Sequence, residues 1–176
     1  MSVLTSRLRL ALPPNTSGQD IALAASSQDV PSVAGRLLRK GWFLEDICGL
    51  DMAEGLALLY HFARWDRPAR VVLRVLLPHG GPECPTIEHI YPGASWLERE
   101  TSDFFGIAFT GASNTTPLLL AEKLDPPPLS RKPGHRMSTH RLWPLAQWVG
   151  GANGNPLAED LVGDPGVEAP APKDRP

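Results

Sequence analysis

The chain has 176 residues and a mass of 19.1 kDa, a length typical of a single domain. Apolar residues make up 42% of it, enough for a hydrophobic core, and the net charge of -2 argues against partners such as nucleic acid. Of its 19 prolines, about twice the average share, eleven fall at or after Pro117. This distribution predicts a folded core over residues 1–111, an extended partner-binding arm over 112–148 and a disordered tail over 149–176.

The apolar residues and the cysteines argue against four further classes, namely membrane-spanning proteins, proteins with a signal peptide, disulfide-rich proteins and iron–sulfur proteins. The longest apolar stretches, such as Val71–Leu77, are too short to span a bilayer. No continuous apolar segment follows Arg7 and Arg9, as a signal peptide would require. Cys48 and Cys84 are too few for a disulfide framework or an iron–sulfur cluster, so we expect them to be reduced packing residues of a cytosolic chain.

The first forty residues predict two short strands and a helix. Charged and apolar residues alternate over Arg7–Leu12, as in a half-buried strand, and Asp20–Ala25 predicts a second strand. Ser26–Asp29 has the composition of a helix start, and we expect Gly41 to end the helix. The apolar residues of that helix fall on one face, namely Val30, Val33, Leu37 and Leu38.

Three longer strands are predicted next, over Trp42–Asp51, Leu56–Trp65 and Arg70–Leu77. The short link Asp66–Ala69 has turn chemistry and predicts an antiparallel hairpin. A helix followed by consecutive strands indicates an α+β fold, a mostly antiparallel sheet with helices packed on it. The extended Pro-rich C-terminal arm would follow this core.

A second helix is predicted over Trp96–Phe105. Ser95 and Glu98 have the spacing of a capping box, with Ser95 as the N-cap, and Gly106 is placed to stop the helix. Ile107–Phe109 then predicts a short strand.

The charged residues of this helix are the main candidates for a functional site. Arg99 and Asp103 are four residues apart and can pair along the surface, while Glu100 and Asp103 share one face. Such carboxylates could be a solvated face, acid/base groups of an enzyme, or contacts to a partner chain. No His or Cys is interleaved with them, and the chain has no recognisable nucleophile or cofactor motif, so we assign no catalytic, cofactor-binding or metal-binding residue.

Residues Lys123–Trp148 mix basic residues, prolines and two tryptophans, Trp143 and Trp148. Prolines lower the entropy cost of ordering an extended segment, and Trp and Arg are common anchors of protein interfaces. The segment therefore suits an arm laid over another protein better than a nucleic-acid site.

The segment Tyr91–Gly111, YPGASWLERETSDFFGIAFTG, resembles the signature of the hydrophilic C-type (30-kilodalton) subunit family of respiratory complex I, NADH-quinone oxidoreductase. The matching features are an aromatic-Pro-x-Ala start, a Glu-Arg-Glu run, an Asp, and an aromatic-Gly-Ile-x-Phe-x-Gly ending. Trp42–Asp51 resembles the family's strand that ends in an Ile-x-x-Val-Asp pattern. After Gly111 the chain lacks the His-Pro and Leu-Arg-Arg elements of complex I, and here it is more similar to related subunits of membrane-bound, energy-converting [NiFe] hydrogenases.

This resemblance implies a non-catalytic hydrophilic subunit of a membrane-associated electron-transfer complex, without an iron–sulfur cluster, flavin or metal of its own. The implied partners are the large hydrogenase-like subunit, which bears the quinone site or the [NiFe] centre, and a neighbouring iron–sulfur subunit. The chain would be cytoplasmic and peripheral to the inner membrane, touching it only through the complex. The expected subunit-interface residues are Glu98, Arg99, Glu100, Asp103, Phe105, Gly106, Arg131 and Lys132.

Several alternatives remain open at this point. The resemblance does not separate a quinone reductase from a hydrogenase complex. A free-standing small enzyme would use the carboxylates of Glu98, Glu100 and Asp103 as acid/base groups. An orphan adaptor protein, which has lost its complex, is the third possibility.

Overall fold

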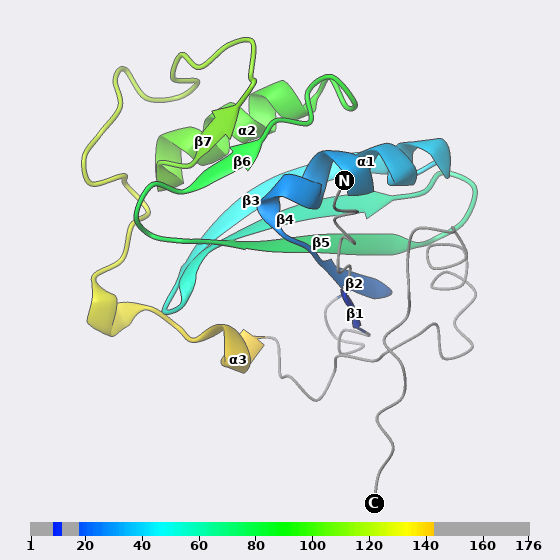
Figure 1. Ribbon diagram of the computed structural model, residues 1–176, viewed down its shortest axis with the longest axis horizontal. Helices are drawn as coiled ribbons and strands as arrows, with labels where there is room; N and C mark the ends of the chain where they lie inside the picture. Colours follow the sequence, from blue (N-terminus) through cyan, green and yellow to red (C-terminus); the bar gives the residue numbers. More distant parts are fainter. Residues whose placement is uncertain (1–8, 12–17, 143–176) are drawn as a thin grey trace, which may run out of the picture.

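The strongly apolar segments of the chain lie at the centre of a five-stranded main sheet, whose strand order in space is β1–β2–β5–β4–β3. The computed structural model describes residues 9–11 and 18–142 (Figure 1). Within the sheet only β2 and β5 are parallel, and the other three neighbouring pairs are antiparallel, which confirms the expected fold class. The strand bounds are β1 Arg9–Ala11, β2 Ile21–Ala24, β3 Phe43–Met52, β4 Gly55–Ala63 and β5 Arg70–Leu77.

Two helices share one hydrophobic core with the main sheet. These are α1 (Val30–Arg39), which follows a short 3-10 turn η2 (Ser27–Asp29), and α2 (Ala94–Phe105). The core contains Tyr60 and Phe62 of β4 and Leu73 of β5, all with 0% exposure. Burial of large side chains of this kind stabilises each by about 1.5–3 kcal/mol. The helix predicted from Val30 is confirmed, although Leu38 is 46% exposed and Ala34 takes its place in the core.

A second, two-stranded sheet lies beside α2. Its strands β6 (Glu83–Pro85) and β7 (Ala108–Thr110) are parallel, and α2 is the connection between them (Figure 1). The strand predicted over Ile107–Phe109 is thus present but begins one residue later, while β6 was not predicted from the sequence. Its three residues include a proline and are too few to show an apolar alternation.

Helix α2 packs closely against β3, which is an edge strand of the main sheet. The hydroxyl of Thr101 donates a hydrogen bond to the backbone oxygen of Ile47, 3.4 Å away. The ring of Phe105 lies so close to Gly49 that a Cβ added there would be 2.5 Å from Phe105 Cδ2. Gly49 is therefore needed for the approach of helix and strand, and Phe105 packs against its own chain.

Both cysteines are free thiols, as expected. Cys84 is fully buried with its Sγ 3.4 Å from Tyr60 Oη, and Cys48 packs beside the small cluster on the opposite sheet face. Burial raises the pKa of each thiol to about 11, which is the behaviour of packing residues rather than reactive ones.

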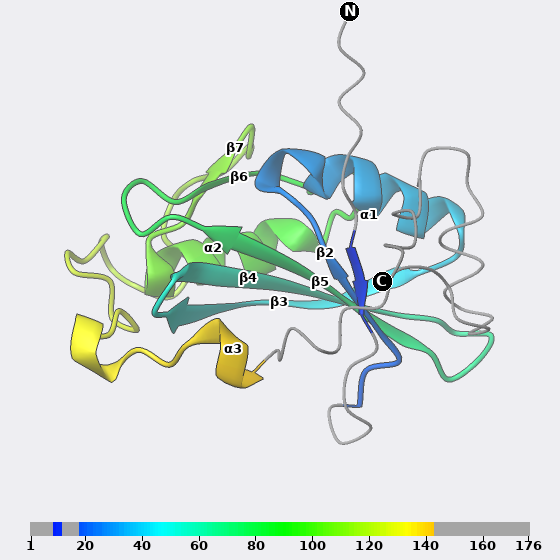
Figure 2. The same cartoon turned by 60° about the horizontal axis from the view of Figure 1, so that its bottom comes forward.

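The arm after Gly111 is irregular, apart from the short helices η3 (Pro133–His135) and α3 (Thr139–Leu142). It leaves β7, passes α2 and returns to the turn between β3 and β4 (Figures 1 and 2). There Met137 forms an isolated bridge with Met52, and the Ala53 N–H donates to Met137 O at 2.9 Å. The arm was expected to extend over a partner, yet over the described residues it is bonded to its own core. Trp143, Trp148 and the tail over 149–176 lie outside the described residues.

We predict that Gly49→Ala destabilises the fold by about 1–3 kcal/mol, because the added methyl group overlaps the Phe105 ring. Equilibrium unfolding in urea measures the change. As a control, Gly80→Ala adds a methyl group where nothing lies within 4 Å. Combining Gly49→Ala with Phe105→Leu should recover part of the loss. Equal stability of Gly49→Ala and the wild type would contradict the close packing of α2 on β3.

Candidate protein-docking site at helix α2 and the arm

Glu98 points into the core and not to solvent. It is 1% exposed, and its carboxylate accepts hydrogen bonds from Thr86 Oγ1 at 2.5 Å and from the Ile87 N–H at 2.9 Å. The burial raises the pKa of Glu98, although these two hydrogen bonds oppose the effect. The predicted capping box is therefore wrong: α2 begins at Ala94 with Gly93 as its N-cap and has no side-chain cap. Glu98 instead holds the segment after β6 against α2.

Arg99 and Asp103 both bind the start of the arm. Arg99 Nε donates to Thr116 O at 2.9 Å, and its Nη2 donates to Pro117 O at 3.1 Å. Asp103 is 6% exposed, and its Oδ2 accepts three successive backbone N–H groups, from Leu118, Leu119 and Leu120, at 2.8, 2.8 and 3.2 Å. The expected surface pairing of Arg99 with Asp103 is thus replaced by contacts from both side chains to the same loop.

The pKa of Asp103 lies below its ordinary value of 3.8. Burial is the largest single influence and acts in the opposite direction, but the three backbone hydrogen bonds and the charge of Arg99 outweigh it. Asp103 is therefore held as a carboxylate, the form that accepts all three donors.

The C-terminal end of α2 fixes the next part of the arm. Gly106 ends the helix with a left-handed φ of 70°, and a Cβ there would lie 2.8 Å from the Pro127 ring. The Leu129 N–H donates to Phe104 O at 3.1 Å. Gly106 was expected at a subunit interface. In the structure it caps the helix and leaves the space in which the Pro127 ring packs.

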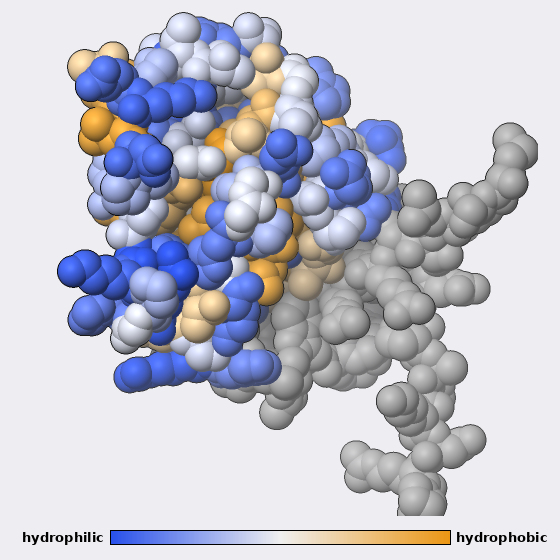
Figure 3. Space-filling model, turned by 60° about the vertical axis from the view of Figure 1, so that its left-hand side comes forward, coloured by the Kyte–Doolittle hydropathy of each residue, from blue (hydrophilic) through white to orange (hydrophobic). Residues whose placement is uncertain are grey.

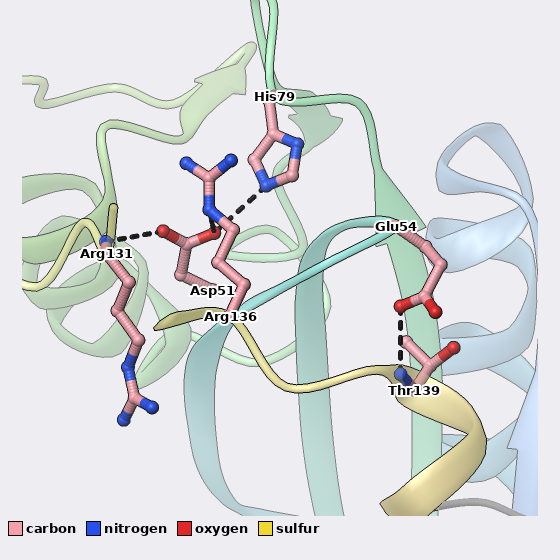
Figure 4. Close-up of polar contacts among 6 residues, drawn as sticks. All are labelled: Asp51, Glu54, His79, Arg131, Arg136 and Thr139. Carbon is pink, nitrogen blue, oxygen red and sulfur yellow. Dashed lines mark hydrogen bonds and ion pairs between the residues drawn. The ribbon is translucent and has the colours of Figure 1, made fainter. Parts of the chain in front are cut away.

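Asp51, at the end of β3, anchors the arm a second time (Figure 4). Its side chain is 1% exposed and meets His79 Nε2 at 2.9 Å, Arg136 Nε at 2.9 Å and the Arg131 N–H at 2.6 Å. Burial alone would raise the pKa of Asp51, but the hydrogen bonds from Arg131 and His79 and the ion pair with Arg136 lower it. A buried carboxylate with these partners holds residues 131–136 to the sheet.

A third carboxylate binds the last part of the described arm (Figure 4). Glu54 accepts hydrogen bonds from Ser138 Oγ at 2.5 Å and from the Thr139 N–H at 2.8 Å. The two bonds lower the pKa of Glu54 to about 2. Sequence reasoning missed Asp51, Glu54 and Arg136, and the available signal was the Asp that closes the family-like strand Trp42–Asp51.

With its backbone bonded inward, the arm presents apolar side chains to solvent. Leu119 is 61% exposed, Leu124 47% and Leu129 50%, and Trp96 of α2 is 64% exposed. The arm over 112–142 also carries five Lys or Arg residues against two acids, in a chain that is acidic overall. Figure 3 shows this side of the molecule, where apolar and strongly hydrophilic residues alternate. We call the exposed leucines Leu119, Leu124 and Leu129 the leucine row.

The three carboxylates of the enzyme alternative do not come together: Glu98 and Asp103 line one small cleft but bind different segments, and Glu100 does not line it. Glu98 faces residues 86–87, Asp103 faces residues 118–120, and Glu100 is exposed. A cleft between α2 and the arm has a volume of only about 90 Å³ and is lined by Ser95, Glu98, Arg99, Ser102, Asp103, Ala108, Phe109, Ala112, Asn114, Thr115, Thr116 and Lys123. Among the described residues, no group of three His, Cys, Asp or Glu could hold a metal ion. In the same part of the chain, no helix is long and apolar enough to cross a membrane.

We predict that Asp103→Asn frees the start of the arm, because a neutral amide oxygen accepts the three N–H groups more weakly than the charged carboxylate oxygen Oδ2 does. Hydrogen exchange at Leu118–Leu120 should accelerate about tenfold or more, as expected for losing bonds to a charged group. Glu100→Gln, an exposed change on the same helix, is the control. Unchanged protection of these amides in Asp103→Asn would refute the anchoring role.

A second prediction concerns pH. Because the folded pKa of Asp51 is lowered, its stabilising contribution is present above the ordinary Asp pKa and disappears as the pH falls through the folded value. At pH 7 Asp51→Asn should therefore lower the free energy of unfolding by about 1–3 kcal/mol, and the difference from wild type should shrink towards acid pH. Urea unfolding between pH 7 and 3 measures this, with exposed Glu83→Gln as the control. A difference that grows in acid would show the sign to be wrong.

Comparison of the sequence with known proteins identifies the family of this chain. Residues 23–137 match the family described as respiratory-chain NADH dehydrogenase, 30 Kd subunit. The C-type subunit of NADH-quinone oxidoreductase from Roseiflexus sp. (strain RS-1) is 31% identical over 143 residues, which are 74% of this chain and 82% of the relative. The C-type subunit of F(420)H(2) dehydrogenase from Methanosarcina mazei is 32% identical over 80 residues, 44% of this chain and 51% of the relative.

A solved chain of the membrane-bound sulfane sulfur reductase, an archaeal respiratory membrane complex, has a similar fold. Its TM-score is 0.55 at 19% identity, over 82% of this chain and 81% of that chain. The matched residues include Asp103 and Asp51, which hold the two ends of the arm, and strands β3, β4 and β5 of the main sheet. The resemblance inferred from Tyr91–Gly111 is confirmed, and the chain belongs to the 30-kDa subunit family of the respiratory-chain NADH dehydrogenase.

Proposed function

We propose that this chain is a non-catalytic hydrophilic subunit of NADH-quinone oxidoreductase or of a related membrane complex, such as an energy-converting [NiFe] hydrogenase, and that its arm binds the large hydrogenase-like subunit. One observation carries the proposal: the charged signature residues of α2 fix the arm so that the leucine row faces solvent. Exposed apolar residues on a bonded backbone are typical of a surface that another chain covers.

The positive charges of the arm favour a partner surface that carries acidic residues. Arg131 and Lys132 are exposed next to the leucine row, and the arm as a whole is basic. The large subunit should therefore present an apolar cleft with acidic residues at its rim, because complementary potentials favour association and register.

The interface residues expected from the sequence then divide into two groups. Glu98, Arg99, Asp103, Phe105 and Gly106 act indirectly, because their contacts within the chain determine where the arm lies. Glu100, Arg131 and Lys132 are exposed and are proposed as direct contacts.

The proposal includes the place of the chain in the complex. It would be peripheral to the inner membrane on the cytoplasmic side, with a neighbouring iron–sulfur subunit as a second partner. It would hold no cofactor and would support electron transfer by stabilising the subunits that do.

We predict that replacing Leu119, Leu124 and Leu129 by Ser weakens binding of the large subunit. Each of these leucine side chains is about half exposed in the free chain, and its removal from the interface should reduce the binding free energy by roughly 1 kcal/mol. For the three together this is at least a tenfold loss of affinity. Affinity purification through a tag on this chain, with the amount of large subunit determined by mass spectrometry, measures the loss.

The matched control replaces Leu38 by Ser, a leucine of similar exposure on α1. Equal recovery of the large subunit by the leucine-row variant and the control would contradict the proposed face. If the wild-type chain itself recovers no large subunit, the orphan adaptor is the correct interpretation. The maturation proteins and metal content that accompany the large subunit would distinguish a hydrogenase from a quinone reductase.

A further inference from the structure

Trp65 is the most exposed large apolar side chain among those the structure describes. It lies in the loop between β4 and β5 and is 85% exposed. One side of its indole nevertheless has a fixed neighbour, because Trp65 stacks on Phe43 with 4.2 Å between ring centroids and 16° between planes. An aromatic residue held in this way loses little conformational entropy when a partner binds it.

The loop around Trp65 is also held in place. Arg64 forms a two-pronged pair with Asp66, with Nε 2.7 Å from Oδ1 and Nη2 2.8 Å from Oδ2. The guanidinium of Arg64 lies 5.6 Å from the ring centroid of Trp42, a core residue with 1% exposure. The loop is therefore connected to the core on one side and displays Trp65 on the other.

Basic residues surround this loop. The end of α1 and the loop lie at the same end of the main sheet, away from the arm and the β3–β4 turn (Figures 1 and 2). Residues 36–40 and 64–70 contain six basic residues, namely Arg36, Arg39, Lys40, Arg64, Arg67 and Arg70. Three acids contact this set: Asp66 pairs with Arg64, Glu45 pairs with Arg70, and Asp20 accepts the Arg70 N–H. Basic residues therefore outnumber the acids that contact them. We call Trp65 with these basic residues the Trp65 surface.

We propose that the Trp65 surface is a second docking surface, which takes an acidic segment of a second subunit of the complex. The inference rests on the proposed function only in that the chain works within a multi-subunit complex. A fixed Trp beside Arg residues is the composition of an interface hot spot, and the local charge selects an acidic partner. An anionic membrane is disfavoured, because one exposed aromatic residue offers much less apolar area than interfacial binding uses.

The two docking surfaces can be tested in one experiment on the assembled complex. A photo-crosslinking amino acid is introduced at Trp65 in one variant and at Leu124 of the leucine row in another. We expect the Trp65 variant to crosslink to an acidic segment of one subunit, and the Leu124 variant to a different subunit, the large one. Peptide sequencing by mass spectrometry identifies both crosslinked segments.

The outcomes separate the two proposals. Crosslinking from position 124 but none from position 65 would overturn the Trp65 surface and leave the proposed function standing. A crosslink from position 65 to lipid, to a second copy of this chain or to a segment without acidic residues would also overturn it. Failure at position 124 with success at position 65 would instead overturn the assignment of the leucine row.

A binding measurement completes the test. The combined change Trp65→Ala and Arg39→Glu should lower retention of the second subunit at least tenfold in salt washes, while the large subunit is kept. Leu76→Ala, an exposed apolar change on β5, is the control. Equal retention in variant and control would overturn the proposal, and unchanged urea unfolding of the variant shows that a loss is not caused by misfolding.

Discussion

The path of the arm depends on one constraint, that backbone N–H groups removed from water need acceptors even where the chain has no regular structure. Residues 118–120 meet it through a single oxygen, Asp103 Oδ2, which accepts all three of their N–H groups. Because this carboxylate lies on a helix packed against β3, the direction in which the arm leaves the core is set by the core. The later contacts, Pro127 at Gly106 and Arg131 at Asp51, follow from that direction.

The regular elements were largely predictable because each has a local cause in the sequence. Runs of apolar, aromatic and β-branched residues indicated β3, β4 and β5. The turn Asp66–Ala69 indicated the hairpin of β4 and β5, and Gly106 indicated the end of α2. The parallel pairing of β2 with β5 was not predictable, since it joins residues about fifty positions apart and leaves no local pattern. Strand β6 was missed because three residues that include a proline show no apolar pattern, and its pairing with β7 joins segments on either side of α2.

The candidate site shows a different limit of sequence reasoning. The signature over Tyr91–Gly111 identified the family, but a charge pattern on a helix does not reveal which charges face inward. Glu98 was expected on the surface and is buried, because Thr86 and Ile87 supply the hydrogen bonds that make its burial possible. Likewise, the return of the arm to Asp51 and Glu54 joins residues about eighty positions apart. No spacing rule within a single helix or strand contains such a contact.

Strand β3 connects the two proposed docking surfaces. Its first residue, Phe43, supports Trp65, and its last residues, Asp51 and Met52, hold the arm. Ten residues of extended backbone span at most roughly 33 Å, and the β-bulge between Leu44 and Asp46 shortens this length. From Asp46 to Met52 continuous pairing with β4 limits bending of the strand. The two ends of the molecule are thus joined by one stiff element of defined length. Partners bound at the two proposed docking surfaces would therefore be held at a nearly constant separation.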